Sequence, residues 1–306
     1  MAEALRIGSM IETDRPITDI VGQVRRLADA GFAHAFASQI FGLDALTLLA
    51  AVGAEVPGIE LGTGVVPVQA RHPMMLAQQA LTVQALTGDR LLLGIGLSHQ
   101  VVVESMWGMS YAKPGSYMRE YLASLMPLLH GEAVHSSGEQ VTTHAFAPLN
   151  IRGVSAPPVL VAALGPAMLK LTGTVADGTI TWMTGTKTIG SHISPSIRAA
   201  AEAAGRPEPR VVVALPVAVT NDVETAKERV NTLFSIYPNL PSYRAMLDKE
   251  GADAAADIGF IGDEESVVAS IGKLAEAGAT DFVAGIVGDE AERARGFNLL
   301  SELARA

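Results

Sequence analysis

Three apolar runs of this chain end in residues whose side chains or backbone could do chemistry. Residues 59–67 contain a Gly-Thr-Gly turn, residues 90–98 lead directly into His99, and residues 158–164 lead into Gly165. Imidazole transfers protons near pH 7, glycine lets a backbone lie against a flat ligand, and free N–H groups at a helix start favour phosphate. Because these features follow successive apolar runs, they predict an enzyme whose cofactor lies across one edge of a parallel sheet.

Other chemical motifs are incomplete. Gly94 and Gly96 would open a dinucleotide-binding motif, but His99 stands where the third glycine is required. The seven histidines are scattered and no His-Glu-x-x-His pair occurs, which argues against a metal site. The sequence contains no cysteine, so disulfides, thiolate ligands and cysteine nucleophiles are excluded. We therefore expect no bound metal.

Apolar strand-like runs alternate with amphipathic helical runs along nearly the whole sequence, which predicts parallel strands joined by right-handed crossovers. We expect an α/β fold, a (β/α)8 TIM barrel formed by residues 1–306 as a single domain, with a doubly wound sheet as the alternative. Residues 131–157 are expected to form a surface insertion with a hairpin, and residues 222–278 two or three helices. The expected strands are 5–11, 34–40, 59–67, 90–98, 158–164, 179–183, 211–219 and 280–287.

The bulk composition limits the range of partners. A net charge of -10 and a pI near 5.2 disfavour nucleic acid and anionic membranes, because both require a basic surface. The N-terminal residues lack the basic and apolar regions of a signal peptide, and the longest apolar run, 211–219, is too short to span a bilayer. We expect a soluble, cytoplasmic protein that acts on a small molecule.

Taken together, these motifs resemble the luciferase-like monooxygenase superfamily, and within it the branch that uses the deazaflavin coenzyme F420. The resemblance is most specific in the block GTGVVPV…RHP…LAQQALTVQALTGDRLLLGIGLSH, with further matches at LADAGF, MREYL, PPVLVAALGP and VADGTITWMTG. It implies a (β/α)8 barrel with an insertion, usually a dimer, and a non-prolyl cis peptide at the end of the third strand. The matching bond is Gly64–Val65.

The resemblance also implies which residues bind the cofactor. The Gly64–Val65 bulge would lie behind the central ring, and the helix that starts after Gly165 would hold the coenzyme phosphate. Ser98 or Thr184 would support the ring or its linker. The full expected set of cofactor-binding residues is Ser38, Gly64, Val65, Ser98, His99, Ala163, Leu164, Gly165, Pro166 and Thr184.

The chain departs from its relatives at two positions that matter for chemistry. Sugar-phosphate dehydrogenases of this branch carry Asp-His at the end of the second strand, with the histidine as base, whereas this chain has Ser38 and Gln39. They also carry glutamate where His99 stands. These differences favour reduction of an activated C=C or C=N bond, with a hydride from the coenzyme and a proton from His99. Glu12 is the alternative acid, and Gln39 is expected to orient a substrate oxygen.

Two alternatives to this function remain open from the sequence. FMN is the alternative cofactor, because no residue of the sequence distinguishes a site for its tricyclic ring from a site for that of F420. The corresponding function is an FMN-dependent luciferase-like monooxygenase. The other alternative is a non-catalytic cofactor-binding relative, in which bulky side chains would fill the substrate space.

The apolar segments 43–56 and 74–86 predict a homodimer, unless neighbouring helices of the same barrel cover them.

Overall fold

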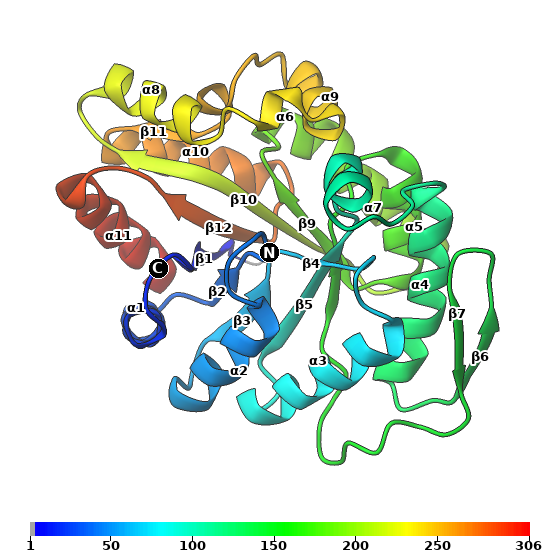
Figure 1. Ribbon diagram of the computed structural model, residues 1–306. Helices are drawn as coiled ribbons and strands as arrows, with labels where there is room; N and C mark the ends of the chain where they lie inside the picture. The colour runs from blue at the N-terminus through cyan, green and yellow to red at the C-terminus, as the bar shows by residue number, and fades with distance from the viewer. Residues whose placement is uncertain (1–3) are drawn as a thin grey trace.

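The computed structural model describes residues 4–306 and contains a closed barrel of parallel strands, as the sequence predicts (Figure 1). The last barrel strand pairs with the first, with Arg6 opposite Asp281, which closes the ring. Closure brings the carboxyl ends of all these strands to one face of the molecule. The barrel strands, in chain order, are β1 (Arg6–Met10), β2 (His34–Ala37), β3 (Glu60–Thr63), β5 (Leu91–Gly96), β8 (Val159–Val161), β9 (Gly178–Trp182), β10 (Arg210–Val219) and β12 (Asp281–Ile286).

Helices pack around the outside of the barrel (Figure 1). On the first of them, Ile20, Val24 and Leu27 recur at helical spacing and are buried against the sheet. Aspartate at the N-cap starts several of these helices, as Asp263 does by accepting the Ser266 N–H. The outer helices are α1 (Ile17–Asp29), α2 (Ala45–Glu55), α3 (Pro73–Thr87), α4 (Pro114–Leu129), α5 (Pro166–Val175), α7 (Ser194–Ala203), α10 (Glu264–Glu276) and α11 (Glu290–Arg305).

The segment that follows β10 is more elaborate than predicted. It contains the expected helices α8 (Val223–Leu233), α9 (Pro241–Glu250) and α10, and in addition a strand, β11 (Phe260–Gly262). β11 pairs in parallel with the last residues of β10, outside the closed ring. The sequence did not predict it, because three residues are too few to give an alternation signal.

The insertion predicted at 131–157 contains an antiparallel hairpin, as expected. Its strands are β6 (Val134–Ser137) and β7 (Thr142–Ala145), and Figure 1 shows them at the outer edge of the molecule beside α4. A second local feature interrupts the third strand. After Thr63 the chain breaks away from β3 and forms the short strand β4 (Val66–Pro67), which pairs with the end of β5.

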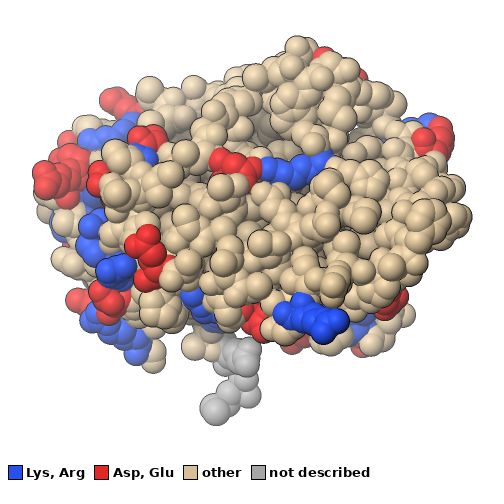
Figure 2. Space-filling model, turned by 60° about the horizontal axis from the view of Figure 1, so that its bottom comes forward, with Lys and Arg blue, Asp and Glu red and all other residues tan. Residues whose placement is uncertain are grey.

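Helices α2 and α3 pack side by side and present a face with few charges. Glu55 is the only charged residue within the two helices. Figure 2 brings this lower side of the barrel forward and shows mostly uncharged residues across its centre, with charged residues mainly around the edges. A shallow groove of about 510 Å³ lies on this face, and it is lined by Leu46, Thr47, Ala50, Met75, Gln78, Gln79, Thr82 and Val83.

Ionisable side chains close the barrel at its N-terminal end. The Arg210 guanidinium lies 2.5 Å from Asp281 Oδ1, and His34 Nε2 lies 3.2 Å from the same oxygen. Burial opposes ionisation of Asp281, but hydrogen bonds from His34 and Arg210 outweigh it and hold the pKa of this carboxyl below its usual range. Arg6 and Glu60 extend the cluster, and each of the five residues is the first residue of its strand.

The middle of the barrel is filled by apolar side chains. Gly62 is required there, because a Cβ on it would come within 2.2 Å of the Phe36 ring. Side chains therefore fill the barrel from its N-terminal end up to this layer. The cavity begins beyond the layer, toward the C-terminal end. The interior residues are Phe36, Leu92, Leu160, Ile180, Val212, Ala214 and Val283.

Candidate active site

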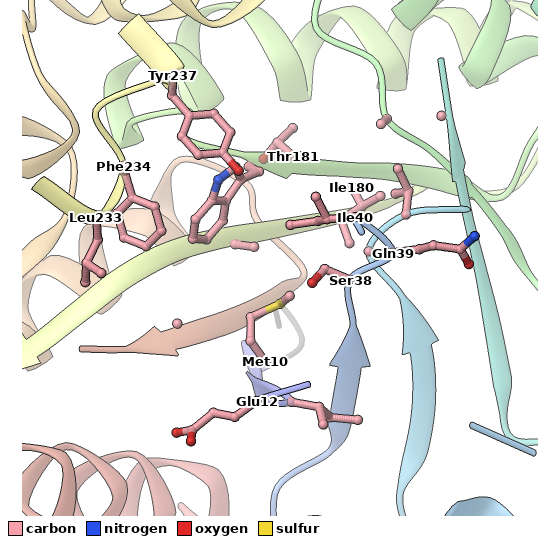
Figure 3. A pocket seen from close by; sticks show the side chains of 18 of the residues that line it. Met10, Glu12, Ser38, Gln39, Ile40, Ile180, Thr181, Leu233, Phe234 and Tyr237 are labelled. Carbon is pink, nitrogen blue, oxygen red and sulfur yellow. The ribbon is translucent and has the colours of Figure 1, made fainter. Parts of the chain in front are cut away.

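A large cavity opens at the C-terminal end of the barrel, where the sequence places the chemistry. Its volume is about 1620 Å³. A pocket for one drug-sized ligand occupies roughly 300–1,000 Å³, so this cavity has room for two ligands at once. Figure 3 shows Met10, Ser38 and Ile180 from three different strands and loops directed toward the same open space.

One wall of the cavity is the bulge after β3. The Gly64–Val65 peptide bond is cis, at the position that the family resemblance implies. The neighbouring strand contributes glycine where the bulge approaches it: a Cβ on Gly94 would lie 1.8 Å from the Thr63 carbonyl oxygen. The Thr63 hydroxyl donates to the Gly94 carbonyl over 2.7 Å and ties the two strands together. The bulge is therefore held firmly against β5.

His99 lines the cavity just past the end of β5. Its ring is half-buried and lies with its centre 5.8 Å from that of Tyr243. Its backbone carbonyl accepts the N–H groups of Val102 and Val103, at the start of the short helix η1 (Val101–Met106), which fixes the residue in place. Burial lowers the pKa of the imidazole, so the neutral ring predominates at pH 7 and the protonated ring is a stronger acid.

The two other predicted catalytic residues line the cavity but are engaged elsewhere. The Glu12 carboxylate pairs with Arg293 on α11 and with Arg15. In Figure 3 its side chain points away from Ser38. The Gln39 amide oxygen accepts the Ala45 N–H over 3.2 Å and thereby braces the start of α2. The geometry therefore favours His99 over Glu12 as the available acid.

An aromatic wall that the sequence did not predict lines the cavity beside His99. We define it as Trp182, Phe234, Tyr237 and Tyr243. The Trp182 ring centre lies 5.4 Å from that of Phe234 and 6.1 Å from that of Tyr237, and Tyr237 and Tyr243 pack edge to face at 4.9 Å. Burial raises the pKa of both tyrosines, so their hydroxyls stay protonated at neutral pH. The concentration of aromatic residues in 234–243, in a chain with 5% aromatics, was the available signal.

Most of the predicted cofactor-binding residues line the cavity, but three do not. Thr184 is fully buried and its hydroxyl donates to the Trp182 carbonyl, so it does not support a ligand in the cavity as predicted. Ala163 is fully buried behind the strand, and Pro166 lies exposed at the first turn of α5. The residues that do line the cavity are Ser38, Gly64, Val65, Ser98, His99, Leu164 and Gly165.

The start of α5 presents backbone N–H groups at the cavity edge. Gly165 is the N-cap, and within residues 4–306 no side chain caps this helix end. The first helical hydrogen bond is from the Leu169 N–H to the Gly165 carbonyl, which leaves the N–H groups of Ala167 and Met168 without an acceptor in the helix. Free N–H groups at a helix start bind phosphate favourably.

No group of three or more His, Asp or Glu side chains within residues 4–306 lies close enough to hold a metal ion. No described helix is long and apolar enough to cross a membrane.

Comparison with known proteins finds some that are named as F420-dependent enzymes and others that are named as monooxygenases. A Mycobacterium tuberculosis protein provisionally named a coenzyme F420-dependent oxidoreductase is 27% identical over 277 residues, covering 86% of this chain and 78% of that protein. The coenzyme F420-dependent tetrahydromethanopterin reductase of Methanopyrus kandleri has the same fold, with a TM-score of 0.83 at 22% identity over 98% of both chains. The FMN-bound oxygenating constituent of 3,6-diketocamphane monooxygenase from Pseudomonas putida gives 0.77 at 18% identity, over 99% of this chain and 97% of that one. The model of the luciferase-like monooxygenase family matches residues 4–302, and this chain therefore belongs to that family.

Proposed function

We propose that this protein is a cytoplasmic oxidoreductase that uses coenzyme F420 to reduce an activated C=C or C=N bond of a small organic substrate. One observation carries the proposal: a cavity with room for two ligands has the cis bulge on one wall and a titratable histidine, His99, on another. The similarity to a protein provisionally named an F420-dependent oxidoreductase supports the choice of coenzyme.

The residues of the cavity fit a flat ring with a phosphate-bearing arm. Gly94 and Gly96 lack the side chains that would push the bulge out of place, since a Cβ on Gly96 would lie 2.8 Å from the Val65 side chain. The bulge, Ser38 and Ser98 would hold the ring, and the free N–H groups at the start of α5 would hold the phosphate. When bound, the deazaflavin supplies a hydride.

His99 supplies the proton in this proposal. Hydride addition to a conjugated acceptor leaves an anion on the substrate, and a positioned acid that neutralises it contributes roughly a hundredfold or more to the rate. The half-buried imidazole can exchange protons with solvent at the mouth and deliver them inside. The tyrosines of the aromatic wall keep their protons at neutral pH, and they shield the substrate from water.

Two alternatives are separated by cavity occupancy and by cofactor preference. A non-catalytic relative would have bulky side chains filling the substrate space, whereas here His99 and Ser38 both border open volume, which favours an enzyme. An FMN-dependent monooxygenase stays the second candidate, because a protein of the same fold binds FMN.

The experiment that tests the proposal is titration of the purified protein with F420 and with FMN, followed by turnover of a cyclic enone with the reduced coenzyme. We expect tight binding of F420, weaker binding of FMN and reduction of the enone. Micromolar affinity for FMN with none for F420 would replace the proposal by its FMN alternative. Tight coenzyme binding with no turnover of enones or imines would favour the non-catalytic relative.

We also infer that the protein is a homodimer formed through α2 and α3. The face that these helices present has few charges, and Met75 and Leu86 on α3 are each about half exposed. Light scattering should give about twice 31.9 kDa. Met75→Asp should lower the mass, whereas the exposed Val268→Asp on α10 should leave it unchanged. A mass near 31.9 kDa for the unaltered protein would refute the dimer.

A further inference from the structure

Large apolar side chains gather in the open around the cavity mouth. We define the apolar rim as Ile40, Phe41, Val101, Leu233 and Ile236. Each is between 58% and 68% exposed, and each lines the cavity. They come from three separate segments, after β2, after β5 and at the C-terminal end of α8, so their convergence is a property of the fold and not of one apolar stretch.

Exposed large apolar residues are scattered on an ordinary surface, and a contiguous group marks a binding site. The aromatic wall continues the apolar rim inward, because Phe234 and Tyr237 follow Leu233 and flank Ile236 in the chain. Figure 3 shows Leu233 and Phe234 side by side at the cavity, with Ile40 across from them. Phe234 packs edge to face on Trp182, so apolar side chains extend from Leu233 at the mouth toward Trp182.

Several charged residues also line the cavity, and some of them are paired. Glu12 lies between Arg15 and Arg293, and Arg229 pairs with Glu292. The apolar rim itself consists of uncharged side chains, so it favours an apolar part of a ligand over an ionic one. The phosphate of the coenzyme is assigned above to the start of α5, so the apolar rim is not needed for it.

We propose that the substrate carries a bulky apolar part, a long alkyl chain or a set of fused rings, which lies across the apolar rim. The reducible group reaches His99 while the apolar part covers the side chains at the mouth. The location of the reducible group rests on the proposed function, whereas the apolar contact does not. Covering these side chains removes them from water, and each buried methylene group strengthens binding roughly fourfold.

Binding can be measured without coenzyme or turnover. Trp107 and Trp182 both line the cavity and are the two tryptophans of the chain, so intrinsic fluorescence reports occupancy. We would titrate the protein with a series of saturated ketones from hexan-2-one to undecan-2-one. The dissociation constant should fall by about threefold to fourfold for each added methylene. A dissociation constant that does not change with chain length would overturn the proposal.

Variants locate the contact. Phe41→Ser and Ile236→Ser, on two of the three segments, should each reduce the preference for undecan-2-one over hexan-2-one by about tenfold. The matched control is Phe146→Ser, because Phe146 is 87% exposed and lies outside the cavity, and it should keep the preference of the unaltered protein. An equal loss in the control would overturn the proposal.

The same variants separate this inference from its rivals. If Phe41→Ser lowers the mass measured by light scattering and leaves the ketone preference intact, the apolar rim contacts a second copy of the chain and the proposal is wrong. If the ketone series behaves as expected but no enone is reduced with any coenzyme, the apolar site stands and the proposed reduction fails.

Discussion

The two ends of the barrel differ: paired side chains close the N-terminal end, whereas the C-terminal end is open. At the N-terminal end, ionisable side chains are packed together, and Asp281 pairs with Arg210 and lies beside His34. At the C-terminal end, the strands border a cavity of about 1620 Å³, and the Trp182 ring packs against Phe234 and Tyr237 on its wall. Side chains fill the closed end, whereas the open end has room for ligands.

Within one strand, the residues at the closed end contribute to stability, and the residues at the open end border the cavity. β1, β2 and β12 each begin in the ionic cluster and end at the cavity, and the apolar interior lies between. Substitutions at the first residue of a strand should therefore act on folding, whereas substitutions a few residues later should act on ligands and turnover.

The largest effect is expected at the closed end. Asp281→Asn removes the buried carboxylate from its pair with Arg210, which leaves Arg210 with the partly exposed Glu60, and breaking a buried ion pair costs about 3–5 kcal/mol. Denaturant unfolding would measure the loss. Asp248→Asn breaks the exposed pair with Arg244 and should change the free energy of unfolding little. If Asp281→Asn unfolds no more easily than that control, the ionic cluster does not stabilise the barrel.

At the open end, His99→Ala should lower turnover of an enone by about a hundredfold and leave coenzyme affinity and the unfolding midpoint nearly unchanged. Steady-state kinetics and coenzyme titration measure the two properties separately. His130→Ala, an exposed histidine at the end of α4, should have normal kinetics. If Glu12→Gln is the inactive variant while His99→Ala turns over, the roles of the two residues are reversed.

A substitution at the start of α5, where the anion site is proposed, should have a smaller effect that is confined to coenzyme binding. Gly165→Asp places a carboxylate beside the proposed phosphate position and should weaken coenzyme binding at least tenfold, or about 1.4 kcal/mol, without affecting the fold. Gly165→Ala is the matched control, because no described atom lies within 4 Å of the Cβ it would add. Equal coenzyme affinity in the aspartate and alanine variants would show that the coenzyme phosphate does not bind at the start of this helix.

The smallest effect is the pH dependence of the rate. Because burial lowers the pKa of His99, its protonated form is a minor species at neutral pH and grows as the pH falls. The rate of enone reduction should rise about threefold between pH 7.5 and pH 7.0 and level off below the pKa. His99→Ala should lose this dependence. A rate that rises with pH instead would assign His99 the role of a base.

The sequence predicted the barrel well because its information is local. Each strand is a short apolar run, and the resemblance to relatives identified the bond between Gly64 and Val65 that the structure has as cis. The ionic cluster escaped prediction because it depends on which strand beginnings become neighbours: Arg6 and Asp281 are 275 positions apart in the chain. No local pattern encodes such a register.

The site was predicted only in part for a related reason. Adjacent residues of a βα turn face different surroundings, so Leu164 lines the cavity while Ala163 is buried behind it. Thr184 fails in the same way, since its hydroxyl turns back to the Trp182 carbonyl. The aromatic wall required knowing that residues 234–243 fold over the mouth, which depends on tertiary packing far from their own sequence.

The short strand β11 has a consequence for how this protein could diversify. Val217–Val219 of β10 pair with Phe260–Gly262, and the Thr220 N–H donates to the Gly262 carbonyl over 2.8 Å. The chain thus leaves the barrel and returns to it at one point, and the excursion between carries three of the four aromatic residues and two of the apolar rim. A loop whose ends meet can be replaced without stretching its scaffold. We therefore expect residues 221–259 to be the part of the barrel that relatives can vary to change substrate choice, provided that a replacement keeps the hydrogen bonds from the Lys187 and Thr188 N–H groups to Glu250.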